Sequence, residues 1–161
     1  MIFVTVGSQL PFDRLIQTID KWAAQNPQHP IFAQIGISPY KPQHIEFCQT
    51  MTPEEYSHYL QQADFIIAHA GMGTIISALE TGKQLLLMPR LASQGEHRND
   101  HQLATAKHFA KLAHIIVANN ELELVDSINQ LCEKDFHHLD KQTSQVSPQL
   151  ITTIQQFLKN C

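Results

Sequence analysis

The stretch "IIAHAGMGTIISALETG", residues 66–82, carries the clearest structural pattern in this chain. An apolar run leads into Gly71 and Gly73, apolar side chains then recur at helical spacing, and the pattern stops at Gly82. Glycine inside a helix or strand costs roughly 1 kcal/mol relative to alanine, so two glycines this close indicate that the backbone itself must approach something. We therefore predict a strand, a tight loop with accessible backbone, and a helix.

The same alternation of strand and helix continues on both sides of this stretch. Short runs of β-branched, aromatic and other apolar residues predict strands at 2–6, 30–36, 44–51, 64–70, 84–89 and 114–118. Apolar residues at helical spacing predict helices at 12–25, 53–63, 73–82, 100–113, 121–133 and 148–159. Strands separated by helices are typical of a Rossmann-like α/β fold, in which a doubly wound, mostly parallel sheet is covered on both faces. The polar segment 133–148 predicts a surface loop.

Length and charge exclude several classes of protein. A chain of 161 residues with 43% hydrophobic composition suits a single domain spanning residues 1–161. A net charge of -4 and the absence of a Lys/Arg run argue against nucleic acid as a partner. The apolar run before Gly7 is too short for a signal peptide or membrane span, so we expect a cytoplasmic location. The three cysteines are odd in number and widely spaced, which favours free thiols.

Both glycine-containing loops are placed to bind an anion. Parallel sheets bind ligands at the carboxyl ends of their strands, where a helix that begins there offers free N–H groups and a positive dipole end. Gly71 and Gly73 would free the backbone of one loop, and Thr74 could cap the helix. Gly7 and Ser8 build the other loop in the same way. Neither loop matches a P-loop or GxGxxG, and a plain tight turn is an equally good interpretation of each loop alone.

A third polar cluster, "PRLASQGEHRNDHQ" at 89–102, follows the strand at 84–89 and so lies at the same edge of the sheet. Its density of polar groups suggests recognition of hydroxyls, with Glu96 accepting from two vicinal hydroxyls and Gln102 donating and accepting at once. His97 and His101 at i and i+4 offer metal binding as the rival interpretation, although no third ligand is indicated. His69, at the end of a predicted strand, is either a satisfied core residue or a loop-ordering residue.

The segment "EFCQTM…ADFIIAHAGMGTIISALETGKQLLLMPR…GEHRNDHQ", residues 46–102, resembles the C-terminal, donor-binding domain of glycosyltransferase family 28. Within that family it is most similar to the small soluble subunits of two-part transferases that build dolichol-linked or exopolysaccharide glycans. The likeness runs from "VTVGSQ" to the last predicted helix. It implies one half of a GT-B enzyme that binds a UDP-sugar and needs no metal or other cofactor, because helix dipoles and backbone amides neutralise the diphosphate.

The resemblance also implies roles for individual residues. It places uracil against the backbone of Phe47 and Cys48, with Met51 packing nearby. It places the phosphates over both glycine loops, at Gly7, Ser8, Gly71, Met72, Gly73 and Thr74. It matches His101 and Gln102 to the family's HQ pair, whose glutamine holds sugar hydroxyls. The family's ribose-binding glutamate is replaced here by Ser77, so Glu80 or Glu96 is expected to take over that contact.

The activity implied by the resemblance is inverting transfer of a sugar to a lipid-linked acceptor in polysaccharide biosynthesis. The general base and the acceptor site would lie on a membrane-anchored partner, which would hold this chain at the inner face of the membrane. The alternatives are a non-catalytic regulatory subunit that binds nucleotide sugars and a stand-alone UDP-sugar hydrolase or epimerase. The predicted helix at 148–159 carries an apolar stripe that either packs on the chain's own sheet or docks on the partner.

Overall fold

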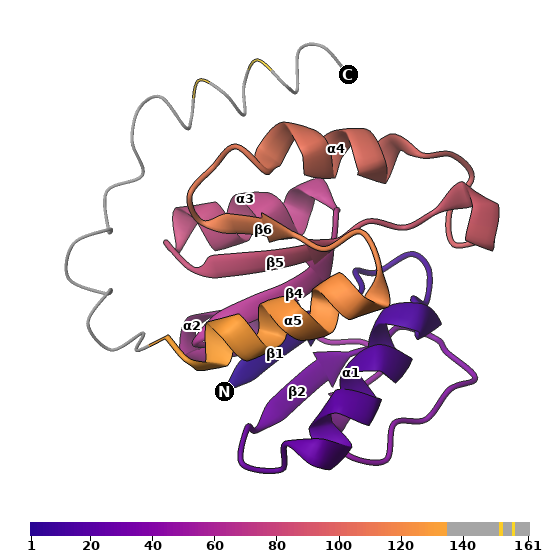
Figure 1. The fold of residues 1–161 in the computed structure, drawn as a ribbon, viewed down its shortest axis with the longest axis vertical. Helices are drawn as coiled ribbons and strands as arrows, with labels where there is room; N and C mark the ends of the chain where they lie inside the picture. The colour runs from indigo at the N-terminus through magenta and orange to yellow at the C-terminus, as the bar shows by residue number, and fades with distance from the viewer. Residues whose placement is uncertain (135–151, 153–155, 157–161) are drawn as a thin grey trace.

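A computed structural model describes residues 1–134, 152 and 156, and these residues build one parallel sheet covered by helices (Figure 1). The described strands form a six-stranded sheet in the order β3-β2-β1-β4-β5-β6, and every pairing is parallel. Their bounds are Ile2–Thr5 (β1), Ile31–Gln34 (β2), Glu46–Cys48 (β3), Phe65–His69 (β4), Gln84–Met88 (β5) and Ile115–Val117 (β6). The predicted Rossmann-like α/β class is confirmed.

The helices lie on both faces of this sheet. Their bounds are Asp13–Gln25 (α1), Pro53–Gln62 (α2), Met72–Glu80 (α3), His101–Phe109 (α4) and Glu121–Cys132 (α5), with a short 3₁₀ turn at Ala92–Gln94 (η1). α1 and α5 pack on one face, where Figure 1 shows α5 crossing in front of the strands. α2, α3 and α4 contribute to the apolar cluster on the other face. No helix in the described part of the chain is long and apolar enough to cross a membrane.

The core follows from strands that are buried from both sides. All four residues of β1 are buried, as are four of the five residues of β4 and of β5. Strands with helices on both faces need apolar residues at every position, which is why they appear in the sequence as continuous apolar runs. α1 adds Leu15, Ile16 and Ile19, each at most 1% exposed, to the cluster under α1 and α5.

Several predicted bounds need correction. α3 begins at Met72 rather than Gly73, because Gly71 itself accepts the first helical hydrogen bond from the Ile75 N–H. The strand predicted at 44–51 is only Glu46–Cys48, and the helix predicted to reach 113 ends at Phe109, since the chain turns there before β6. Of the predicted helix at 148–159, Thr152 and Gln156 have helical backbone; its other residues, and nearly all of the loop predicted at 133–148, lie outside the described residues.

The strand order places the two glycine-containing loops side by side. β1 pairs with β2 on one side and with β4 on the other, so the direction in which the chain winds across the sheet reverses between β1 and β4. β1 leads to α1 on one face, whereas β4 leads to α3 on the opposite face. A parallel sheet leaves a crevice at such a switch point, outside the carboxyl ends of the strands.

Candidate functional site

A cavity of about 640 Å³ lies at this switch point, and we call it the edge cavity. It is lined by residues 5–10, 50–53 and 71–74 together with Gln34, Tyr56, His69, Ser77, Arg90, His97 and Gln102. Among these described lining residues there is no aspartate and no glutamate, while Arg90 brings a positive charge. The edge cavity is therefore suited to an anion.

The N-terminus of α3 opens into the edge cavity without a cap. Gly71 is the N-cap residue and forms no side-chain capping hydrogen bond. Thr74, which could have capped the helix, instead has its side chain buried at 7% exposure. The N–H groups of Met72, Gly73 and Thr74 precede the first helical donor, so they have no carbonyl partner within the helix. Together with the helix dipole they form an anion-binding end.

The glycines of the two loops differ in what a side chain at each position would contact. A Cβ at Gly71 would lie 2.2 Å from Nε2 of His69, and one at Gly7 would lie 2.6 Å from Cε1 of the same ring. A Cβ at Gly73, by contrast, would meet no atom of the described residues within 4 Å. Gly7 and Gly71 therefore make room for the His69 ring. Gly73 is the glycine that leaves open space at the helix N-terminus for a ligand.

His69 is held in its neutral form. Burial lowers the pKa of His69 to about 4, and the positive charge of Arg90 acts in the same direction, while the backbone of Thr5 opposes the shift. In the described part of the chain, the buried side-chain polar atoms that lack a hydrogen-bond partner are His69 Nδ1 and the Tyr56 hydroxyl, and both residues line the edge cavity. Buried unpaired polar atoms are rare in folded proteins, and they concentrate here at one site. The loop-ordering interpretation of His69 fits this position better than that of a satisfied core residue.

Gln34 ties the segments around the edge cavity together, and sequence reasoning missed it. Its Oε1 accepts from the Thr5 hydroxyl at 2.8 Å. Its Nε2 donates to the carbonyls of Gly7 at 2.9 Å and Gln49 at 3.2 Å. One buried amide thus connects the ends of β1 and β2 and the segment after β3. A polar residue closing the otherwise apolar run "IFAQ" was the available signal.

Arg90 and Gln102 form a second connection at the edge cavity. The Arg90 side chain is 2% exposed and donates to the carbonyls of Val6 at 2.9 Å, Leu10 at 2.6 Å and Pro11 at 2.6 Å. The backbone N–H of Arg90 donates to Oε1 of Gln102 at 3.1 Å. Because this N–H can only donate, the Gln102 oxygen must face it, and the amide NH₂ is the end left for a ligand.

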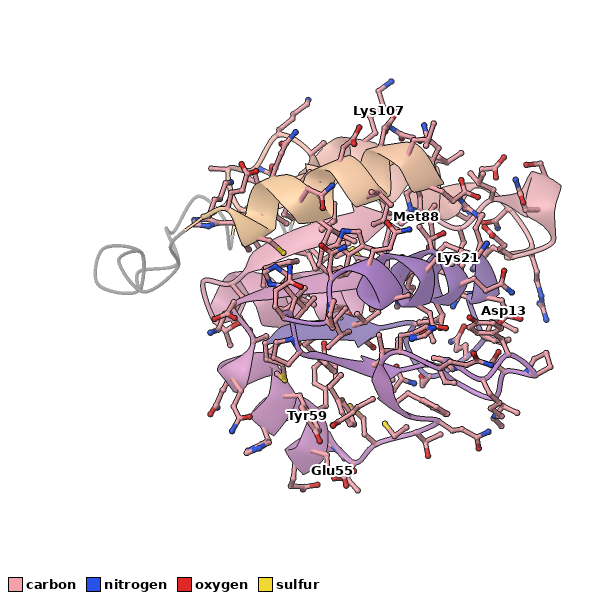
Figure 2. All side chains as sticks on the ribbon, turned by 60° about the horizontal axis from the view of Figure 1, so that its bottom comes forward. Asp13, Lys21, Glu55, Tyr59, Met88 and Lys107 are labelled. Atoms are coloured by element: carbon pink, nitrogen blue, oxygen red, sulfur yellow. The ribbon has the colours of Figure 1, made fainter. Side chains whose placement is uncertain are left out.

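Glu96, one of the two residues expected to contact the ribose, lies outside the lining of the edge cavity. Its carboxylate accepts from Nε and Nη2 of Arg14 at 2.6 and 2.8 Å and from the Leu91 N–H at 2.8 Å. It lines a second hollow, of about 800 Å³, which we call the α1–α5 groove. This groove is lined by Pro11, by α1 residues that include Asp13 and Lys21 (labelled along α1 in Figure 2), and by residues 94–96, 121, 122 and 125. Glu96 is thus an ion-pair partner, not a lining residue of the edge cavity.

Other predicted contacts also fall outside the edge cavity. Phe47 and Cys48 belong to β3, where Phe47 packs against the core and the Cys48 carbonyl accepts from the Ile35 N–H at 3.0 Å. His101 begins α4 and is exposed. The edge cavity does bring together Gly7, Ser8, Met51, His69, Gly71, Met72, Gly73, Thr74 and Gln102. In place of Phe47 and Cys48, the segment 50–53 lines it.

Fold and site together define a Rossmann-like α/β domain with a crevice at the switch point and an uncapped helix N-terminus in that crevice. The chain belongs to glycosyltransferase family 28, since residues 1–157 match the model of the family's C-terminal domain. The predicted family is therefore confirmed.

Individual relatives agree with this assignment. The chain is 24% identical over 136 residues to UDP-N-acetylglucosamine transferase subunit ALG13 of Yarrowia lipolytica, covering 74% of this chain and 65% of the relative. It is 30% identical over 127 residues to the human protein of the same name, covering 71% of this chain but 10% of the relative. The solved structure of the kitacinnamycin glycotransferase superposes with a TM-score of 0.64 at 19% identity, over 99% of this chain and 42% of that one. The chain thus spans less than two thirds of the length of each of these proteins.

Proposed function

We propose that this chain is the UDP-sugar-binding subunit of an inverting glycosyltransferase that adds a sugar to a lipid-linked acceptor in polysaccharide biosynthesis. One observation carries the proposal. The edge cavity faces the uncapped N-terminus of α3 and the buried Arg90, and no carboxylate from the described residues lines it. A diphosphate matches that combination of free N–H donors and positive charge. The relatives' name, UDP-N-acetylglucosamine transferase subunit, supports a UDP-sugar as the donor.

The lining residues suggest how the donor lies. The diphosphate would sit on the N–H groups of 72–74, with Gly7 and Ser8 on its other side. The sugar would meet the amide NH₂ of Gln102, and the uracil would pack against Met51 and its neighbours at 50–53. Ser77 stands where the family's ribose-binding glutamate is expected, but its hydroxyl donates to the Gly73 carbonyl at 3.0 Å. The ribose contact therefore has no assigned residue.

The chemistry asked of this chain is stabilisation of the leaving group. An acceptor hydroxyl would attack the anomeric carbon from the face opposite UDP, and the negative charge that develops on UDP would meet the free N–H groups and the dipole of α3. The attacking hydroxyl also needs a general base. His69 is unsuited to that role, because its pKa of about 4 makes it a weak base and its ring is packed against Gly7 and Gly71. We assign the base, and the acceptor site, to a partner polypeptide.

A membrane-anchored partner would complete the enzyme. The printed name of the relatives describes a subunit, which supports an assembly of more than one chain. A lipid-linked acceptor requires that one member of the assembly reach the membrane. This chain would then be cytoplasmic and held at the inner face of the membrane through that partner.

Calorimetry with UDP and UDP-N-acetylglucosamine in EDTA tests the donor assignment. We expect both to bind without a divalent metal, because helix N–H groups and Arg90 supply the positive potential. Binding that appears only after Mg²⁺ or Mn²⁺ is added would contradict this account. Sugar transfer should be seen only when a membrane fraction containing the partner is added. Consumption of UDP-sugar by the isolated chain would instead indicate a hydrolase or epimerase.

A further inference from the structure

Arg90 is a buried cation that forms no salt bridge with a described residue, and the hydrogen bonds of its guanidinium to the loop 6–11 have not been given a role above. Its guanidinium donates only to backbone carbonyls: those of Val6, Leu10 and Pro11 at 2.6–2.9 Å and that of Glu96 at 3.4 Å. No hydrogen bond joins it to a carboxylate of the described residues. A buried charge is costly unless it is compensated, so an arginine kept in this state indicates a use for its charge.

A second arginine beside it provides the contrast. Arg14 and Arg90 both lie over the ring of Phe12, at 5.3 and 4.8 Å from its centroid. Arg14 is neutralised by the carboxylate of Glu96, which raises the pKa of Arg14. Burial lowers the pKa of Arg90, and the charge of Glu96 only partly opposes that shift. Two arginines therefore share one aromatic platform, but only one of them has its charge matched at contact distance.

Arg90 turns carbonyl groups of the first glycine-containing loop toward itself, and this orientation explains why its charge is left without a carboxylate partner. Its carbonyl partners come from both ends of the segment 6–11, which includes Gly7 and Ser8 of the edge cavity. A loop whose carbonyls are turned toward a cation presents less of its own negative potential to a ligand on its other side. Arg90 also lines the edge cavity itself, so its positive charge acts across a wall of low dielectric constant.

We propose that Arg90 is the positioning residue for the donor diphosphate: it turns the carbonyls of the loop 6–11 away from the phosphates, and its unmatched charge supplies positive potential that a divalent cation supplies in other nucleotide sites. This rests on the proposed function, since it takes a nucleoside diphosphate as the ligand. The two contributions separate by substitution. Arg90→Gln keeps donors for the carbonyls but removes the charge, whereas Arg90→Lys keeps the charge but loses the planar fork.

The experiment is calorimetry with UDP and with uridine in EDTA, on the wild type and both variants, with thermal melting as the check on folding. We expect Arg90→Gln to weaken UDP roughly 10- to 100-fold and uridine less than about threefold, because only UDP carries the phosphates. Arg90→Lys should recover part of that loss. The matched control is Arg14→Met/Glu96→Gln, which removes the neighbouring arginine and its ion pair at no change in net charge. Because neither side chain lines the edge cavity, it should alter either affinity less than about threefold.

The outcomes distinguish this proposal from the proposed function. If wild-type protein binds no UDP, the function fails whatever the variants do. If wild type binds UDP and Arg90→Gln weakens UDP and uridine equally, Arg90 is only part of the scaffold and the proposal is wrong. If Arg90→Gln does not fold, Arg90→Lys decides: a loss for UDP at least threefold greater than for uridine supports the proposal, and equal losses overturn it.

Discussion

The edge cavity and the α1–α5 groove are hollows of similar size, about 640 and 800 Å³, but their charges are arranged in opposite ways. The groove holds acids and bases together, and its central pair, Arg14 and Glu96, is bidentate at 2.6 and 2.8 Å. The edge cavity holds Arg90, the end of α3 and neutral His69, with no acid from the described residues. Polar groups without a hydrogen-bond or ion-pair partner, rather than a larger volume, identify the edge cavity as the candidate ligand site.

The largest expected effect is a loss of folding stability at acid pH, which arises from His69 in the edge cavity. His69 has a pKa of about 4 when folded and an ordinary value of 6.5 when unfolded, so the unfolded chain binds a proton first as the pH falls. Stability should be full above pH 6.5 and should fall between pH 6.5 and 4, by on the order of 3 kcal/mol. Urea unfolding at several pH values measures it.

His69→Asn is the control for that pH dependence. It removes the titrating group while keeping a polar side chain. The loss of stability on going from neutral to acid pH should therefore become much smaller than in the wild type. An unchanged pH profile in His69→Asn would show that the acid sensitivity arises elsewhere, and the contrast between the hollows would lose its electrostatic basis.

The same substitution at two glycines should separate the scaffold of the edge cavity from its ligand space. Gly71→Val places a Cβ 2.2 Å from Nε2 of the buried His69 ring, so we expect a destabilisation of about 1–3 kcal/mol by overpacking. Gly73→Val meets open space, so the fold should survive. Gly73→Val should nevertheless weaken UDP more than tenfold by filling the phosphate position. Thermal melting and calorimetry are the two measurements; equal melting temperatures for the two variants would contradict the assignment of Gly71 to His69.

Gln102→Ala tests which part of the donor lies at the end of the edge cavity formed by Gln102. Its amide NH₂ is directed at the ligand because its oxygen is held by the Arg90 N–H. Removing the amide should weaken UDP-N-acetylglucosamine by roughly 1–2 kcal/mol, and UDP by less. Calorimetric titrations with both ligands give the difference. Equal losses for the two ligands would remove Gln102 from the sugar position.

The smallest effect is expected in the α1–α5 groove. Glu121 is 48% exposed and lies 3.8 Å from Nη1 of Arg14, which makes a weak surface pair. Glu121→Gln should change the free energy of unfolding by less than about 1 kcal/mol and leave UDP affinity unaltered. Denaturant titration and calorimetry report the two quantities. Weakened UDP binding in this variant would mean that the groove communicates with the donor site.

The sequence predicted the fold better than it predicted the site. Strands β1, β4 and β5 each appear in the sequence as an apolar run, because a strand covered on both faces needs apolar residues throughout. The glycines at 71 and 73 and the switch-point topology likewise placed the anion end of α3. These features depend on local pattern and on the rule for parallel sheets, both of which are present in the sequence.

The differences between the predicted site residues and the lining of the edge cavity have another cause. The Glu96 carboxylate forms an ion pair with Arg14, which lies 82 positions upstream, and Arg90 donates to the carbonyl of Val6, 84 positions upstream. No periodicity records which of two nearby arginines will meet a carboxylate. Gln34 was missed for the same reason, since its role depends on meeting Thr5 and the Gly7 carbonyl, which lie on a neighbouring strand and the loop beyond it.

The Gln34 amide has a consequence for how the donor would enter. Because it holds the ends of neighbouring strands and the first glycine-containing loop in place before any ligand arrives, little chain entropy is left to be lost on association. The site should then act as a rigid receptor, with affinity differences between donors expressed in their dissociation rates. A structure with UDP bound should keep the backbone of residues 5–8 and 69–74 within about 1 Å of its present course.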